Sequence, residues 1–422
     1  MENEQVVHEL IGYVVSRLFE GEEVGAIEKF LVEQGIPKDV SEKIVQSGLD
    51  HFGDIKEQLK HFEEVDELYK AEKWQEVVLT MHKLTSPSFM RQLSDLRELL
   101  KRLDMALDAA HKTGDPKLLA MTQGNLGNVY NQAGENQRAL ECFQNAYDYG
   151  KASGDLQWQA QGLNFLATTY MRMEKYDEAI KSQEESVEIS RKLENPEMLA
   201  YSISVLGDVH LMYCQENTEN VAKTIEVYEE AITLFLKLEL EDHLAQPYTN
   251  VGSAYAMVGE YQKAVDYIEK SIAIKIKQND LYGLVVSLRN VTDIYHTLKD
   301  HKNALASLEK LVGLKEKINI TSLLPEVLTR RAYYYLEKGL HDKSIEDYKV
   351  VIESNPKDVA VVYYGLARSY AAKKENKQAL DTLQKALEKG FNDFKLLEED
   401  EYISIIKDDP QYQDLISKYV KK

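Results

Sequence analysis

The chain contains few side chains whose type and spacing would support a reaction. Its ten histidines are scattered, and no HExxH pair, which binds zinc from one face of a helix, is present. Gly124 and Gly127 form neither a GxGxxG nor a P-loop pattern, and both fall inside a predicted helix, where backbone amides are not available to a phosphate. Neither GxSxG nor a CGSCW-type cysteine motif occurs. The sequence therefore predicts a protein that is not an enzyme and that uses no metal and no cofactor.

The isolated polar residues favour structural roles. Cys142 falls on a predicted packing helix, where it is expected to act as a small buried apolar residue. His210 stands where equivalent segments carry a tyrosine, so packing is preferred over metal binding. The acidic run at residues 398–401 is interpreted as a solvated face, because runs of like charge usually face water.

The composition favours a folded, helical chain. Of the 422 residues, 44% are hydrophobic and 29% are charged, which is enough apolar material to bury a core. Alanine, leucine, glutamate and lysine are abundant and there are only eight prolines, so helix is favoured over strand. The length fits either a few ordinary domains or one elongated array.

The charge and the cysteines limit the partners and the compartment. A net charge of −20 disfavours nucleic acids and anionic lipid surfaces, so neither is expected as a partner. Cys142 and Cys214 are too far apart in sequence for a CxxC pair and form no disulfide framework. The N-terminus does not resemble a secretory signal, and no stretch approaches the roughly 18 apolar residues of a membrane span. The expected location is a reducing one, the cytoplasm.

An internal repeat dominates the chain. A small residue recurs seven times, with steps of 40, 40, 45, 40, 40 and 35 residues, at Gly127, Ala167, Gly207, Gly252, Thr292, Ala332 and Ala367. Three residues after each stands an aromatic residue, at Tyr130, Tyr170, His210, Tyr255, Tyr295, Tyr335 and Tyr370. A second small residue follows a turn, at Ala139, Ala179, Thr224, Ala264, Ala304, Ser344 and Ala379. Each repeat therefore predicts a hairpin of two closely packed helices, with the aromatic residue filling the space between neighbouring hairpins.

Turn residues mark the ends of the predicted helices. Glycines at 134, 259 and 339 fall in the turn within a hairpin. Five further residues are predicted to end helices as C-caps: Gly114, Gly154, Asn195, Asn279 and Asn319.

The pattern resembles the tetratricopeptide repeat (TPR) family. In the first regular repeat the residues that carry the resemblance are Leu126, Gly127, Tyr130, Ala139, Phe143 and Ala146. The resemblance covers roughly residues 116–388 and implies an all-α fold, a right-handed TPR-like superhelix of stacked helical hairpins. The repeats exceed the usual 34 residues, as in LGN-type adaptors, kinesin light chains and the bacterial Rap and PlcR peptide receptors, which they resemble.

The expected organisation has four parts. Residues 1–58 form a small helical N-terminal unit, 59–115 a divergent TPR-like repeat whose connection is broken at Pro87, 116–388 seven TPR-like repeats, and 389–422 a C-terminal capping segment. Residues 212–224 are an insertion, expected as a loop on one edge.

The N-terminal unit invites one alternative. Three helices are expected there, the second at roughly 23–34 and the third after Pro37, and the turn between them is similar to a DNA-binding helix-turn-helix. The would-be reading helix carries Asp39 and Glu42 beside two lysines in an acidic segment, so DNA binding is disfavoured.

The resemblance also implies a binding surface. In TPR arrays the first helix of each hairpin lines a groove, and its exposed positions contact an extended peptide or a partner helix. The residues at those positions that are predicted to bind a peptide are Asn125, Asn128, Asn164, Asn250, Arg289 and Asn290. An asparagine amide both donates and accepts, so it can pair with a peptide backbone, although capping or solvating a helix is the alternative.

Two comparisons refine the partner. Chaperone-binding TPR domains hold a C-terminal carboxylate with lysines, and here Gly124 occupies the place of the first lysine, which argues against such a clamp. Arg289, Arg330 and Arg368 are expected to give the C-terminal half a positive lining that an acidic side chain would pair with.

The predicted function is that of a non-catalytic scaffold or adaptor that binds a protein or peptide ligand. A peptide-responsive intracellular regulator of the Rap or PlcR kind, with the N-terminal unit as effector, is the alternative. The partner's identity and the oligomeric state stay open at this stage.

Overall fold

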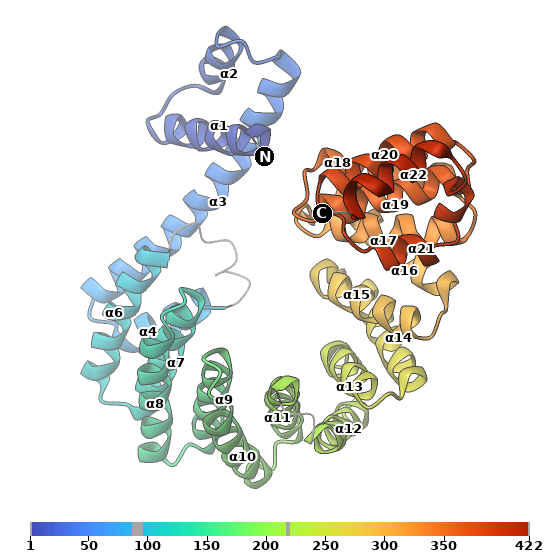
Figure 1. The fold of residues 1–422 in the computed structure, drawn as a ribbon. Helices are drawn as coiled ribbons and strands as arrows, with labels where there is room; N and C mark the ends of the chain where they lie inside the picture. Colours follow the sequence, from blue (N-terminus) through green and yellow to red (C-terminus); the bar gives the residue numbers. More distant parts are fainter. Residues whose placement is uncertain (1, 87–95, 217–219, 421–422) are drawn as a thin grey trace. The chain divides into compact units, whose positions relative to one another are not determined.

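The computed structural model describes residues 2–86, 96–216 and 220–420, and no β-strand occurs in these ranges. The chain forms two compact units, Met1–Val209 and His210–Lys422, whose division falls within one helix. Each unit consists of antiparallel helices stacked side by side (Figure 1). The all-α hairpin fold predicted from the repeat is confirmed.

The first unit begins with three helices that are not part of a regular repeat. The helices of the unit are α1 (Glu2–Phe19), α2 (Val24–Glu33), α3 (Lys38–Lys70), α4 (Trp74–Leu84), α6 (Leu96–Thr113), α7 (Pro116–Gln132), α8 (Asn136–Ser153), α9 (Leu156–Arg172), α10 (Tyr176–Lys192) and α11 (Pro196–Glu216), which crosses into the second unit. Val14, Ile27, Leu31, Ile44 and Val45 form the small core that joins α1, α2 and α3.

The predicted boundary at residue 58 lies inside α3. This helix continues without a break from the N-terminal core to the residues that pack on α4 and α6. The division of the first 115 residues into two parts therefore stays a prediction. Pro87, the predicted break, lies outside the described residues.

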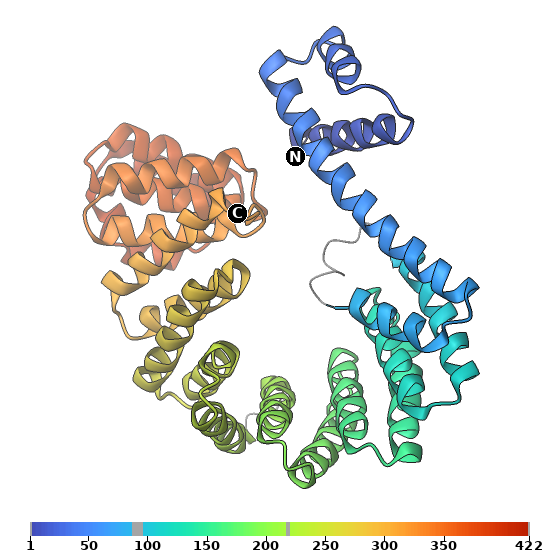
Figure 2. The same ribbon diagram turned by 180° about the vertical axis from the view of Figure 1, so that it is seen from behind.

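The second unit repeats the hairpin and ends in a cap. Its elements are α12 (Val221–Lys237), η2 (Glu241–His243), α13 (Ala245–Met257), α14 (Tyr261–Gln278), α15 (Leu281–Thr297), α16 (His301–Gly313), η3 (Leu314–Glu316), α17 (Leu324–Glu337), α18 (His341–Glu353), α19 (Val359–Ala372), α20 (Asn376–Glu388), α21 (Phe394–Glu399), η4 (Ile403–Ile406) and α22 (Pro410–Val420). Leu397, Ile403 and Leu415 of the last three elements are buried in one core with α19 and α20, so this segment covers the apolar side of the last hairpin. Figure 2 shows the stacked helices of each unit from behind.

The hairpin α7–α8 shows how the sequence builds each repeat. Asp115 caps α7 by accepting a hydrogen bond from the Lys117 amide at 2.8 Å, and Pro116 occupies the first turn. The chain turns at Gly134, whose φ of 79° suits a residue without a Cβ. The two helices then approach so closely that a Cβ at Gly127 would lie 2.4 Å from the Phe143 ring. We call the first helix of each hairpin the A helix and the second the B helix.

The predicted packing positions are confirmed. The seven small residues of the A helices are buried, and the seven of the B helices have no exposed surface. His210 is 4% exposed, which agrees with a packing role. Cys142 is half-buried and not fully buried as predicted, but its partial burial still raises the pKa of the thiol to about 11, so it stays protonated near neutral pH.

Two predicted C-caps are wrong. Gly114, Gly154 and Asn279 adopt the left-handed conformation, as predicted. Asn195 does not: Glu194 takes the positive φ, and the Asn195 side chain accepts a hydrogen bond from the Met198 amide at the start of α11. The Asn319 side chain likewise accepts from the backbone of a following residue, because a short Asn side chain competes well for nearby amides.

The insertion at 212–224 differs from the expected loop in its described part. Residues 212–216 continue α11 and 221–224 begin α12, whereas 217–219 lie outside the described residues. Most of the extra length therefore extends the two helices of one hairpin.

A ladder of tyrosine–glutamate hydrogen bonds joins successive hairpins of the second unit. Three of the four repeat tyrosines in this unit donate to a glutamate on the preceding B helix: Tyr255 to Glu229 at 2.5 Å, Tyr295 to Glu269 at 3.0 Å and Tyr335 to Glu309 at 3.0 Å. Burial and the neighbouring carboxylate raise the pKa of each phenol, so all three remain donors near neutral pH. The repeated tyrosine therefore fixes the spacing of hairpins as well as filling space.

Candidate functional site

The A helices of the second unit are linked directly to one another. We call α13, α15, α17 and α19 the A-helix row. Asn290 of α15 donates to the Ser253 hydroxyl of α13 at 3.2 Å, and Arg330 of α17 pairs with Asp293 of α15. These polar contacts hold the row together on the side where the resemblance places a ligand.

A pocket of about 330 Å³ opens on the C-terminal part of this row. Four tyrosines line it together with an exposed valine and an arginine: Tyr333, Tyr334, Tyr348, Tyr364, Val361 and Arg368. We call it the tyrosine pocket. Its lining comes mainly from α17, which also contributes Arg330, and from α19, with His296 added from α15 and Tyr348 from the B helix α18. Such aromatic walls suit an apolar or aromatic group better than a charged one.

The charge at the pocket is balanced within the chain. Arg368 forms an ion pair from Nε to the Asp400 Oδ2 atom at 2.7 Å and lies 3.9 Å from a carboxylate oxygen of Glu337. Tyr364 also donates to Asp400, at 2.7 Å, and burial together with this bond raises the pKa of the Tyr364 phenol. The guanidinium lies 5.1 Å from the centre of the Tyr402 ring. Arg368 is thus held by residues of the capping segment and is not a free cation. Because Asp400 is buried in this ion pair, the predicted solvated face of residues 398–401 is wrong at this residue.

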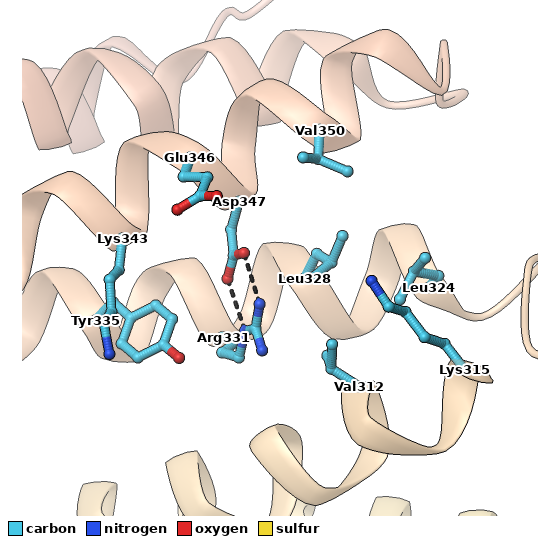
Figure 3. A pocket seen from close by; sticks show the side chains of 10 residues that line it. All are labelled: Val312, Lys315, Leu324, Leu328, Arg331, Tyr335, Lys343, Glu346, Asp347 and Val350. Atoms are coloured by element: carbon cyan, nitrogen blue, oxygen red, sulfur yellow. Dashed lines mark hydrogen bonds and ion pairs between the residues drawn. The ribbon is translucent and has the colours of Figure 1, made fainter. Parts of the chain in front are cut away.

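A second pocket, of about 290 Å³, lies on another face of α17 (Figure 3). Arg331 and Asp347 join across it through two hydrogen bonds, Nε to Oδ2 at 2.8 Å and Nη2 to Oδ1 at 2.7 Å. Figure 3 shows Lys343 and Lys315 on either side of this pair. We call it the arginine pocket. A bidentate pair satisfies the hydrogen-bonding groups of the guanidinium. Arg331, the cation at the centre of the arginine pocket, is therefore already paired with a carboxylate of the chain.

The predicted asparagines of the first unit are engaged in contacts with their own chain. Asn125 is 6% exposed, and its Oδ1 lies 3.2 Å from Nδ1 of His82 on α4. Asn164 accepts from Ser186 at 2.9 Å and from Gln183. Asn128, one turn from Asn125 on α7, is half-buried. The three side chains lie on adjacent A helices, but Asn125 and Asn164 act as links between helices.

The predicted residues of the second unit are similarly placed. Asn250 accepts from Gln246 on its own helix at 2.9 Å, and Asn290 bonds to α13 as described. Arg289 lies 3.6 Å from a carboxylate oxygen of Glu326. Arg330 and Arg368 are likewise paired with acidic residues of the chain. The carboxylates expected to come from a ligand are therefore supplied by the protein itself. A direct role of these residues in peptide binding stays a prediction.

A buried lysine occupies an unexpected position between A helices. Lys275 of α14 is 2% exposed and donates to the hydroxyls of Thr249 at 2.9 Å and Ser287 at 2.8 Å. It forms no ion pair among the residues that the structure describes. At the equivalent positions of the first unit, Ser190 and Asn164 take the places of Lys275 and Thr249 in a similar buried polar cluster. The lysine is thus a charged replacement in a cluster that hydroxyl groups can fill.

We expect Lys275→Met to stabilise the second unit at neutral pH by roughly 1–2 kcal/mol, because it removes a buried charge while Thr249 and Ser287 still bond to each other at 2.9 Å. Burial lowers the pKa of Lys275 below its ordinary 10.5, so the wild type regains stability as pH rises toward 10.5. Urea unfolding between about pH 7 and about pH 9.5, below the range where free tyrosines ionise, should show the difference shrinking.

The exposed Lys277 on the same helix provides the control, and Lys277→Met should change stability little at any of these pH values. A Lys275→Met protein less stable than the wild type at pH about 7 would show that the hydrogen bonds of the amine outweigh its desolvation.

Among the described residues, no helix has the length and apolar character needed to cross a bilayer. Residues 2–86, 96–216 and 220–420 contain no group of three or more His, Cys, Asp or Glu side chains placed to bind a metal ion.

Comparisons with known proteins agree with the repeat. Family models described as tetratricopeptide repeat together match more than half of the chain, at residues 119–151, 160–197, 212–277, 293–318, 325–358 and 361–389. Response regulator aspartate phosphatase A of Bacillus subtilis is 27% identical over 179 residues, 41% of this chain and 43% of that protein. Tonsoku-like protein of Drosophila melanogaster is 26% identical over 200 residues, 44% of this chain and 14% of that protein. The chain thus spans less than half of the length of these relatives.

Among solved structures, a signal transduction ATPase with a tetratricopeptide repeat sensor from Pyrococcus horikoshii is similar in fold. Its TM-score is 0.59 at 14% identity, and the match covers 86% of this chain and 56% of that one. With the repeat confirmed in sequence, in burial and in fold, the chain belongs to the tetratricopeptide repeat family.

Proposed function

We propose that the protein is a non-catalytic, cytoplasmic scaffold that binds a peptide segment of a partner protein along the A-helix row. The tyrosine pocket carries this proposal, because it is a hollow with mainly aromatic walls on the helices that line the binding groove of TPR arrays. In this proposal one apolar side chain of the ligand fills the pocket and anchors the segment.

The charges of the row indicate the character of the segment. Asp293 and Glu326 keep 63% and 49% of their side chains exposed, while the arginines beside them are each paired with a carboxylate. The whole chain carries a net charge of −20. An acidic segment would meet no unpaired cation on this row, so the proposed ligand is neutral or basic.

Two exposed valines allow a matched test of the site. Val361 lies at the tyrosine pocket and is 54% exposed; Val350 lies at the arginine pocket and is 44% exposed. We expect Val361→Arg to abolish the binding of peptides selected on the wild type from a random displayed library, because the arginine fills the mouth of the pocket. Val350→Arg should leave their affinity within about twofold, as expected for a surface change away from the contact.

The affinity of the selected peptides for the three proteins would be measured by isothermal titration calorimetry, with circular dichroism to verify the fold. If Val350→Arg abolished binding and Val361→Arg did not, the result would show that peptides bind at the arginine pocket and not at the tyrosine pocket. Failure of the wild type to select any peptide would contradict the proposed function.

A peptide-responsive regulator is the second candidate. The 27% identity over 179 residues to response regulator aspartate phosphatase A of Bacillus subtilis favours it. In this case the N-terminal helices α1–α3 act as the effector, and peptide binding changes their exposure. Hydrogen exchange with and without a selected peptide distinguishes the two: a scaffold is protected only near the A-helix row, whereas a regulator also changes in α1–α3.

A further inference from the structure

Tyr348 provides the base of the tyrosine pocket. It extends from α18 toward α19, where the tip of its ring meets Gly365: a Cβ on this glycine would lie 2.4 Å from the Tyr348 Cζ atom and 2.6 Å from its hydroxyl. Gly365 stands at the repeat position that Asn125, Asn250 and Asn290 occupy in other hairpins. Because Gly365 has no side chain, the hydroxyl of Tyr348 on the B helix α18 can reach the tyrosine pocket on the A-helix row.

The hydroxyl of Tyr348 is left without a partner, unlike those of its buried neighbours. Tyr334 bonds to His296 Nδ1 at 2.7 Å, and Tyr364 bonds to Asp400 at 2.7 Å. No hydrogen bond within the described part of the chain engages Tyr348, although only 3% of this residue is exposed. The hydroxyl lines the tyrosine pocket and is not among the fully enclosed polar atoms, so it faces the pocket, and a ligand atom seated there has to replace water as its hydrogen-bond partner.

The surroundings restrict what that atom belongs to. Burial raises the pKa of Tyr348 to about 12, so its hydroxyl is protonated and able to donate. The nearby Arg368 charge is balanced by Asp400 and Glu337, whose carboxylates repel an anionic group. A lysine or arginine side chain would bring a cation into a pocket that Arg330 and Arg368 already line, and a purely apolar side chain leaves the hydroxyl unpaired. The remaining match is an aromatic body for the walls with a neutral oxygen at its tip.

We propose that the tyrosine pocket is selective for a tyrosine side chain of the ligand, whose phenol oxygen accepts a hydrogen bond from the Tyr348 hydroxyl. This inference rests on the proposed function, since it specifies the anchor residue of the same peptide site. The aromatic walls bind the ring, and Tyr348 distinguishes tyrosine from phenylalanine.

Two small probes test the selectivity on the full chain: N-acetyl-L-tyrosine amide and N-acetyl-L-phenylalanine amide. Binding is followed by nuclear magnetic resonance titration. We expect the tyrosine amide to bind the wild type about fivefold more tightly, as one neutral hydrogen bond provides. In Tyr348→Phe the two probes should bind equally, at the affinity that the wild type has for the phenylalanine amide.

Tyr335→Phe is the control, because it removes a phenol that bonds to Glu309 and does not line the tyrosine pocket. It should preserve the fivefold preference. Equal binding of both probes to the wild type overturns the selectivity while leaving the peptide site intact, and this comparison does not depend on the folding of any variant. Absence of binding by both probes, in a protein that still selects peptides blocked by Val361→Arg, overturns the inference alone. If neither probe binds and the wild type selects no peptide, the proposed function is contradicted as well.

Discussion

Replacement of Phe143 by alanine is expected to lower the free energy of unfolding of the first unit by about 3–5 kcal/mol. The side chain has no exposed surface, and its ring stacks on Phe165 with the ring centres 4.9 Å apart. Gly127 closes on the other side, so the A helix of this hairpin has no side chain that could fill the resulting cavity. Urea unfolding followed by tryptophan fluorescence measures the loss, because the two tryptophans, Trp74 and Trp158, both lie in the first unit.

Phe30→Ala provides the control for this prediction. Phe30 is 40% exposed and belongs to the same unit, so its truncation should lower stability by less than about 1 kcal/mol. If Phe143→Ala unfolded with a midpoint close to that of Phe30→Ala, the close approach of α7 and α8 would not be the main stabilising contact of this hairpin.

Asp400→Ala is expected to destabilise the second unit by about 3 kcal/mol, because it leaves the Arg368 guanidinium inside the protein with only the distant Glu337 carboxylate. It also removes the acceptor of Tyr364 and the cap of the Ile403 amide, which Asp400 Oδ1 binds at 2.8 Å. The loss should be visible by circular dichroism, while tryptophan fluorescence, which reports on the first unit, should change little.

Asp393→Ala separates the ion pair from the cap. Asp393 caps the Leu396 amide at 2.9 Å in the same segment but neutralises no buried arginine, so its removal should be unfavourable by about 1 kcal/mol. Combining Asp400→Ala with Arg368→Met should restore part of the stability, because the unpaired charge is then absent. Equal losses for the two aspartates would show that Asp400 acts only as a cap.

The stacked hairpins could be predicted because their packing depends on local spacing. The small residues, the tyrosines and the turn glycines recur at fixed intervals, and each interval corresponds to a contact between helices that are neighbours in sequence. The exceptions are turns such as those at Glu174 and Lys299, which adopt a positive φ without glycine. There the packing of the two helices outweighs the local preference of the residue.

The binding surface could be predicted only in part. Asn125 and Asn290 lie on A helices as expected, but whether an amide faces a ligand or a neighbouring helix depends on how closely the helices approach, which spacing alone does not define. The tyrosine pocket joins Tyr333 and Tyr364 with the B-helix residue Tyr348, and Tyr364 is in turn bonded to Asp400 of the capping segment. The one local signal was Gly365 at a position where other repeats carry a larger residue.

The most direct test of the account is a crystal structure of the full chain with a peptide selected on it. The account predicts that the peptide lies along α15, α17 and α19 with a tyrosine ring in the tyrosine pocket and its phenol oxygen beside the Tyr348 hydroxyl. A peptide bound in the arginine pocket or on the B helices, with the tyrosine pocket empty, would contradict it.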